Sequence, residues 1–372
     1  MTTRSYLDHA ASAPLRPQVL AEMGEALGLA GNPSSLHGSG RAARRLLEEA
    51  RESLAASLRA EPGEVVFTSG GTEANNLALL GGAAPGRAVA ISAIEHPSVD
   101  GIRGRRDDVR VLPVTASGHL DLDAARAALD DRVGLVSVQW VNNETGAVQP
   151  VRDVVGLGRT VGARVHSDAV QALGHVEIDF AATGLDLMTV SAHKVGGPVG
   201  VGALVVRRGV GVAPSGFGGG QEAKLRSGTV PVALAVGFAA AARLAISELD
   251  AEATRLARLR DRLLDGAVAA TGCSVNTLAP CGPAIANLTF SGLRADDLLL
   301  LLDAAGIDAS TGSACTAGVH QPSEVLLAMG RSLADAGASL RFSFGPDTTS
   351  ADIDRVLAVL PDAVARARGA LA

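Results

Sequence analysis

The segment Val65-Val66-Phe67-Thr68-Ser69-Gly70-Gly71-Thr72-Glu73 passes from an apolar run into a glycine turn, and a helix-like stretch follows through Leu80. β-branched and aromatic residues favour a strand, and glycines permit the tight turn that joins it to a helix. The same succession recurs along the chain. Further strands are expected at residues 88–92, 109–114, 134–141, 164–166, 187–191 and 203–206. Strands separated by helical stretches predict an α/β fold, with a mostly parallel sheet and helices on both faces.

The pattern changes after about Ser247. A long helix is expected at 248–270, followed by short strands at 286–290 and 340–343 and by helices at 296–305 and 350–370. This mixture is typical of a smaller α+β unit. We therefore expect a large domain at residues 13–247, and a small domain made of residues 1–12 and 248–372.

The composition of the 372 residues narrows the class of protein. Hydrophobic residues make up 47% and charged residues 19%, which is typical of a globular chain. The formal net charge is −6 and aromatic residues are 2%. Both values argue against direct nucleic-acid binding, because phosphate recognition needs a basic surface and single strands need stacking platforms.

Membrane and metal association are not expected. The N-terminus shows no secretory signal, and the apolar stretch 232–242 is cut by Arg243, too short to span a bilayer. Three cysteines, Cys273, Cys281 and Cys315, form neither a disulfide framework nor a paired zinc spacing. We therefore expect a reducing, cytoplasmic setting and no metal site.

The long cationic side chains are almost all arginine. Among the 33 Lys and Arg residues, only Lys194 and Lys224 are lysines. An amine can lose its proton and act as a Schiff-base nucleophile, whereas a guanidinium cannot. Lys194 lies in Ser191-Ala192-His193-Lys194-Val195-Gly196-Gly197-Pro198, between an apolar run and glycines, which makes it the candidate nucleophile. A solvated loop cation is the alternative, and Lys224 is interpreted as a surface charge.

The turn at Ser69-Gly70-Gly71-Thr72-Glu73 is a candidate phosphate site. Free N–H groups at a helix start favour a phosphate, and Thr72 adds a hydroxyl donor. An ordinary strand–helix turn is the alternative. Because the turn lacks the lysine of a nucleoside-triphosphate loop, that class of site is not expected.

Asp168 and His96 each follow another expected strand, where sheets of this kind bind ligands. Asp168 either caps a helix or pairs with the cationic ring nitrogen of a cofactor. His96 is either a structural hydrogen-bonding residue or a stacking partner for a flat ring. Together with the phosphate loop and Lys194, these residues fit pyridoxal 5′-phosphate (PLP), an electron sink held by a lysine and an aspartate.

Cys315 lies in Ser310-Thr311-Gly312-Ser313-Ala314-Cys315-Thr316-Ala317-Gly318, a run of small residues. A structural cysteine more often lies in an apolar strand or helix, whereas a thiol on such a loop can reach a substrate. Cys273 and Cys281 carry no such signature. Arg341, on the expected strand 340–343, has the fork geometry that suits a substrate carboxylate, with a structural salt bridge as the alternative.

Ordered segments along nearly the whole chain match one known family. They are residues 31–35, 67–73, 95–96, 141–144, 168 with 171, 193–194, 226–229, 312–316 and 341–343. Through them the chain resembles the cysteine desulfurases of the NifS/IscS type, in the class-V aminotransferase group. The resemblance implies the type I fold of PLP-dependent transferases and a homodimer. Known members often carry Ala where this chain has Gly71.

By that resemblance, Lys194 binds PLP as a Schiff base and moves the Cα proton of the substrate. Asp168 holds the pyridinium nitrogen, Gln171 contacts the ring oxygen, and His96 stacks on the ring and shuttles protons. The remaining contacts are implied for Asn143, which positions cofactor and substrate, for Gly71, Thr72, Ser191 and His193 at the phosphate, and for Thr229 of the neighbouring subunit.

The same resemblance implies the reaction. Arg341 and Asn32 grip the carboxylate of L-cysteine, and Cys315 attacks its sulfur and becomes a persulfide while L-alanine leaves. The sulfur then passes to a protein acceptor, in iron–sulfur cluster assembly or in tRNA thiolation. A selenocysteine lyase or a small-acid aminotransferase on the same scaffold is the alternative, and a non-catalytic sulfur carrier is a further one.

Overall fold

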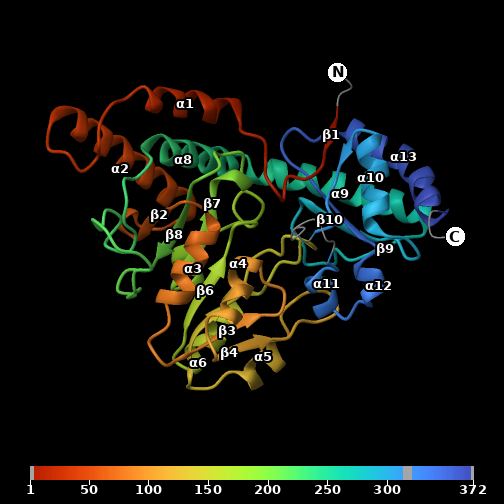
Figure 1. Cartoon of the computed structure of the whole chain (residues 1–372), viewed down its shortest axis with the longest axis horizontal. Helices are drawn as coiled ribbons and strands as arrows, with labels where there is room; N and C mark the ends of the chain where they lie inside the picture. Colours follow the sequence, from red (N-terminus) through yellow and green to blue (C-terminus); the bar gives the residue numbers. More distant parts are fainter. Residues whose placement is uncertain (1–3, 313–320, 370–372) are drawn as a thin grey trace.

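The computed structural model describes residues 4–312 and 321–369, which form two groups of strands and helices (Figure 1). Within these residues the larger sheet has seven strands, in the order β2-β8-β7-β6-β5-β3-β4. Only β8 runs against the others. The strands are β2 (Val65–Thr68), β3 (Ala88–Ser92), β4 (Val109–Leu112), β5 (Val133–Ser137), β6 (Arg164–Asp168), β7 (Leu187–Ser191) and β8 (Gly202–Val206).

Helices cover both faces of this sheet. Val66 and Phe67 are neighbours on β2, yet they lie in different hydrophobic clusters, because successive strand side chains point to opposite faces. The Phe67 cluster includes α2, α5, α6 and α8, and the Val66 cluster includes α3 and α4. The helices are α1 (Pro17–Leu27), α2 (Gly38–Leu58), α3 (Gly71–Gly81), α4 (Pro97–Asp100), α5 (Leu122–Ala128), α6 (Val151–Thr160), α7 (Phe180–Thr183) and α8 (Val232–Ser247). The predicted α/β fold is confirmed.

A smaller sheet is built from the C-terminal part of the chain. Its strands β12, β10 and β9 are antiparallel, while β1 and β11 form a separate parallel pair. The strands are β1 (Ser5–Tyr6), β9 (Ser274–Val275), β10 (Ile285–Thr289), β11 (Ile307–Asp308) and β12 (Ser339–Ser343). The helices are α9 (Leu249–Thr271), α10 (Ala295–Ala304), α11 (Glu324–Ala328), α12 (Leu333–Ala336) and α13 (Ser350–Gly369).

The N-terminus returns to this second group. Leu7 is fully buried in the same cluster as Leu256 and Phe344. Helices α8 and α9 meet with a bend of 73° at their junction. We propose from this pattern that residues 13–247 form one domain, and that residues 1–12 and 248–372 form the other. No single helix in the described ranges is long and apolar enough to cross a membrane, although the bent pair α8–α9 meets that test together.

The structure differs most from the sequence prediction at one strand and at one helix. The expected strand 134–141 ends at Ser137, because its ladder with β6 stops at His166 and the chain then turns through the Asn142 loop. Helix α1 was not predicted. Its Pro17 occupies the first helical position, where the missing N–H of proline costs nothing.

Candidate functional site

The carboxyl ends of five strands meet at one edge of the large sheet, because β2, β7, β6, β5 and β3 all run in the same direction. The polar segments singled out in the sequence follow these ends. They contribute Gly71 and Thr72 after β2, His96 after β3, Asn143 after β5, Asp168 and Gln171 at β6, and Ser191, His193 and Lys194 at β7.

Lys194 ends a short 3₁₀ turn (Ala192–Lys194) directly after β7. Its Nζ donates to the carbonyl oxygens of Ala10 at 2.5 Å and Ala11 at 2.9 Å. Burial, followed by the nearby charge of Arg341, lowers the pKa of the amine to about 8. A larger fraction of this amine is therefore neutral and nucleophilic near neutral pH than of an ordinary lysine.

Asp168 is the last residue of β6 and is buried. Its Oδ1 accepts the Val170 backbone N–H at 2.9 Å, which is the local turn contact expected of a capping aspartate. Its Oδ2 accepts from Asn75 Nδ2 at 2.6 Å, a contact that comes from α3. Both donors are neutral groups, one from the backbone and one from a side-chain amide.

The start of α3 lies against the end of β7. A Cβ built on Gly71 would lie 2.9 Å from Val170 Cγ2 and 3.6 Å from Ser191 Cβ. Ser191 Oγ is buried and has no hydrogen-bond partner among the described residues. Thr72 follows on the first turn of α3 and is exposed. The first turn of α3 and an orphaned hydroxyl therefore lie close together, an arrangement that suits an anion.

Three more predicted residues lie around this edge. His96 is the exposed N-cap residue of α4, and partial desolvation by the surrounding chain lowers its pKa. His193 has its pKa lowered to about 4 by burial and by the Lys194 charge. Gln171 is buried and donates from Nε2 to Ala10 O at 2.8 Å, so the same carbonyl accepts from Gln171 and Lys194.

Arg341 reaches the site from the small sheet. It lies on β12 with 3% of its surface exposed. Its Nη1 donates to Asn143 O at 2.9 Å and its Nη2 to Asp8 Oδ1 at 2.6 Å. Arg341 Nε is buried and unpartnered within the described chain. The guanidinium thus joins both sheets and keeps spare donors.

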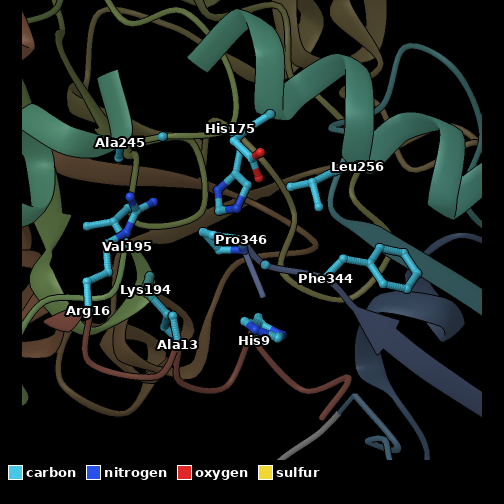
Figure 2. Close-up of a pocket in the computed structure, with 13 residues that line it drawn as sticks. His9, Ala13, Arg16, His175, Lys194, Val195, Ala245, Leu256, Phe344 and Pro346 are labelled. Atoms are coloured by element: carbon cyan, nitrogen blue, oxygen red, sulfur yellow. The ribbon is translucent and has the colours of Figure 1, made fainter. Parts of the chain in front are cut away.

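A small cavity of about 30 Å³ lies beside Lys194, at the junction of the two groups of elements (Figure 2). His9, Arg16, His175 and Phe344 line it. His175 Nδ1 is buried and finds no partner in the described ranges, and burial lowers the pKa of this ring to about 4. The cavity has room for about one water molecule.

Other predicted residues are not brought to Lys194. Asn32 and Thr229 lie on exposed loops, where Asn32 Oδ1 accepts from Ser34 N at 2.9 Å. Cys315 lies outside the described residues. Burial raises the pKa of both Cys273 and Cys281, and neither forms a disulfide. No group of three or more His, Cys, Asp or Glu in the described ranges could hold a metal ion.

Sequence reasoning missed Asn75, Glu95 and the backbone of residues 10–11. Asn75 is 1% exposed among the apolar residues of α3, and a polar side chain on the buried face of a helix was the available signal. Glu95 is buried, and burial raises its pKa to about 8. The Ala10 and Ala11 carbonyls left no signal, because backbone groups carry none.

The chain was compared with known proteins. The family model for class-V aminotransferases matches residues 5–356. A protein of Mycobacterium tuberculosis named "IscS-like cysteine desulfurase" is 48% identical over 383 residues, covering 98% of each chain. A solved structure titled "NifS-like protein" has a TM-score of 0.92 at 32% identity, covering 98% of this chain and 100% of that one. Another, "SspA in complex with cysteine", has a TM-score of 0.81 at 32% identity, covering 93% and 100%.

Proposed function

The chain belongs to the class-V aminotransferase family, and from this premise we propose that it is a PLP-dependent L-cysteine desulfurase. It removes sulfur from L-cysteine, releases L-alanine and leaves the sulfur as a persulfide on Cys315. The observation that carries the proposal is the half-buried Lys194 amine, with its pKa lowered to about 8, at the sheet edge that also holds the Asp168 carboxylate. The names of the full-length relatives support the same reaction.

The residues at this edge fit PLP. Ser191 Oγ is buried without a partner among the described residues, and glycine at position 71 lets α3 begin close to Ser191 and Val170. The start of α3 beside Ser191 suits the phosphate, together with Thr72 and His193. Asp168 suits the ring nitrogen and Gln171 the ring oxygen. When bound, PLP supplies an electron sink that acidifies Cα of the substrate and labilises its Cβ–S bond.

The side chains divide the remaining work. Lys194 holds the cofactor and moves the proton at Cα of the amino acid. His96 lies over the ring, and Asn143 positions cofactor and substrate. Arg341 binds the substrate carboxylate with the guanidinium hydrogens left over from Asp8 and Asn143.

Cys315 makes the reaction a desulfuration. Its thiolate attacks the substrate sulfur, so the Cβ–S bond breaks and an S–S bond forms. Cβ gains a proton and is reduced, the Cys315 sulfur is oxidised, and the products are L-alanine and one persulfide. A thiol reductant or a protein acceptor then takes the outer sulfur. Iron–sulfur assembly and tRNA thiolation are the acceptor systems proposed, in the cytoplasm.

The dimer is part of the proposal. Leu20, Leu27 and Leu29 are each at least half exposed, on α1 and just after it. They lie beside a groove between α1, α2 and α8, the group at the upper left of Figure 1. Exposed apolar side chains beside such a groove support a subunit interface. In that dimer Thr229 reaches the phosphate of the partner's site, and Asn32 completes the carboxylate site.

Product analysis with cysteine variants tests the proposal. The wild type should give equimolar alanine and, with a thiol reductant, sulfide. Cys315→Ala should lose both products and the persulfide seen by mass spectrometry, whereas the matched control Cys281→Ala should keep them. Wild-type rates of sulfide release from Cys315→Ala would overturn the role of Cys315. Keto-acid products would show that the protein is an aminotransferase. Faster release of selenide from selenocysteine than of sulfide from cysteine would show that it is a selenocysteine lyase.

The cofactor assignment has its own test. Borohydride should fix PLP covalently to the peptide that contains Lys194. Lys194→Ala should leave no covalent PLP, and Lys224→Ala should behave as the wild type. Covalent PLP on any other residue would contradict the assignment.

A further inference from the structure

A chain of hydrogen bonds joins the Asp168 carboxylate to the His96 ring. Asn75 Nδ2 donates to Asp168 Oδ2 at 2.6 Å and to Ser98 Oγ at 2.9 Å. Ser98 Oγ lies 2.7 Å from His96 Nδ1. The chain crosses three elements, β6, α3 and α4. It links the two side chains proposed to bind opposite features of the cofactor ring, its nitrogen and its face.

The direction of each bond can be derived from the groups that take part. An amide Nδ2 only donates, and its two hydrogens match the two acceptors of Asn75. A flipped amide would set its oxygen against the Asp168 carboxylate. Asn75 Oδ1 is buried without a partner in the described part of the chain. The orientation of the Asn75 amide is therefore fixed by the two hydrogen bonds that its Nδ2 donates. Ser98 Oγ therefore accepts from Asn75.

The hydroxyl hydrogen of Ser98 is then free to point at His96 Nδ1. The Ser98 backbone N–H also lies 3.1 Å from this nitrogen, and a backbone N–H can only donate. His96 Nδ1 must accordingly carry a lone pair. In the neutral ring the single hydrogen is therefore on Nε2.

We propose that Asn75 and Ser98 are positioning residues that hold His96 as the neutral tautomer with its hydrogen on Nε2. In this tautomer Nε2 is a hydrogen-bond donor. Adding a proton would place it on Nδ1, against the backbone N–H of Ser98, so His96 is a poor general base. Proton transfer at Cα is left to Lys194. This inference deepens the proposed function and rests on it, since it assumes that His96 faces the PLP ring.

The charges around His96 act on the same equilibrium. Burial lowers its pKa first; the Asp168 carboxylate opposes this, and the Lys194 ammonium reinforces it. His193 is the other ionisable ring whose charge interacts with His96. We call the hydrogen bonds from Asn75 to Ser98 and from Ser98 to His96 the relay. It acts in addition to these charges, because it stabilises only the forms of His96 that have no hydrogen on Nδ1.

NMR of the holoenzyme labelled with ¹⁵N-histidine tests the tautomer directly. His96 signals, assigned by their loss in His96→Gln, should show the hydrogen on Nε2 at pH 7.5. His119 provides an internal reference, since its Nε2 lies 2.8 Å from the Pro280 carbonyl and its Nδ1 2.9 Å from Ser117 Oγ. A hydrogen on Nδ1 of His96, or an imidazolium at that pH, would overturn the proposal.

Two variants test the relay. Ser98→Ala removes the hydroxyl donor and should raise the pKa of His96 by about one unit, a shift that Ser98→Thr should reverse. The matched control Ser117→Ala should change only His119. Asn75→Leu frees the Ser98 hydroxyl and should let a fraction of His96 carry its hydrogen on Nδ1. An unchanged tautomer and pKa in both variants would refute the role of Asn75 and Ser98. If Ser98→Ala failed to fold, a hydrogen on Nδ1 of His96 in the wild type would still refute it.

The PLP content of each sample is measured by absorbance. This reading separates the relay from the proposed function. Protein that holds the Nε2 tautomer but binds no PLP would contradict the proposed function and leave the relay intact. Protein that binds PLP but carries the His96 hydrogen on Nδ1 would contradict the relay and leave the proposed function intact.

Discussion

Arg341 Nη2 lies 2.6 Å from Asp8 Oδ1, so strand β12 and the N-terminal segment meet although 333 residues separate them. Asn143 O, in the loop that follows strand β5 of the large sheet, accepts from Nη1 of the same guanidinium. The fork is thus fixed by two elements before any substrate arrives. Such preorganisation reduces the entropic cost of binding a carboxylate, because the long side chain is already ordered.

Arg341→Lys should therefore weaken L-cysteine binding although it keeps the charge. Lysine lacks the planar fork and cannot serve Asp8, Asn143 and a carboxylate together. We expect kcat/KM to fall about ten- to a hundredfold, mainly through KM, as loss of a charge-assisted hydrogen bond implies. Steady-state alanine formation measures this. Arg294→Lys, exposed on the same domain, is the control, and an unchanged KM in Arg341→Lys would refute a carboxylate role.

The lowered pKa of Lys194 predicts how PLP capture depends on pH. Only the neutral amine is nucleophilic, and burial with the Arg341 charge sets its pKa to about 8. The rate at which apoprotein binds PLP covalently should rise about tenfold per pH unit below 8 and level off above it. Stopped-flow absorbance after adding PLP gives this rate. A profile still rising steeply at pH 9.5 would mean an amine with an ordinary pKa.

The sequence predicted the sheet well because its strands carry local signals. Two strands, β3 and β7, have the predicted bounds, and each is a short apolar run that ends at a polar residue. The segment after β5 was predicted as strand because Val138, Trp140 and Val141 are apolar. They are buried by packing beyond the ladder, and single-sequence periodicity cannot separate these two causes of burial.

The site was predictable only where its residues follow strand ends. Lys194, Asp168 and His96 lie at or just after the ends of strands, and the parallel arrangement brings these strand ends to one edge of the sheet. Asn75 was missed because its role depends on the side chains opposite α3. The contacts of Asp8 and Ala10 depend on a chain crossing that brings the N-terminus over β7, and no local pattern encodes such a crossing.

Glu95 predicts a pH-dependent effect on stability. Burial raises its pKa to about 8, while the unfolded chain releases the proton near 4.5. Between these values the folded state retains a proton that the unfolded state has lost, so this group costs stability as pH rises toward 8. Glu95→Gln removes the titration. The difference in unfolding free energy, variant minus wild type, should grow with pH by at most about 1.4 kcal/mol per unit.

Melting temperatures of both proteins at pH 5 to 8 measure this difference. Using a difference cancels the titration of every other group. The exposed Glu52→Gln on α2 is the control and should give a flat difference. A flat difference for Glu95→Gln would show that its carboxyl is ionised in the folded protein. Gln139 N and Ser92 Oγ both donate to Oε1 of Glu95, an atom that glutamine retains. The variant therefore keeps these two hydrogen bonds, and their loss does not contribute to the measured difference.

Gly71→Ala tests how tightly α3 packs on the sheet edge. The new Cβ would lie 2.9 Å from Val170 Cγ2, closer than real Cβ contacts come, and the β-branched Val170 has little freedom to move. We expect a loss of about 1–3 kcal/mol in stability and weaker PLP retention. Val170→Ala makes the space, so the double variant should recover most of the stability lost by Gly71→Ala. Melting temperatures of the four proteins form a double-mutant cycle. Strictly additive effects would show that the two residues do not touch, and that something other than Val170 makes this position favour glycine.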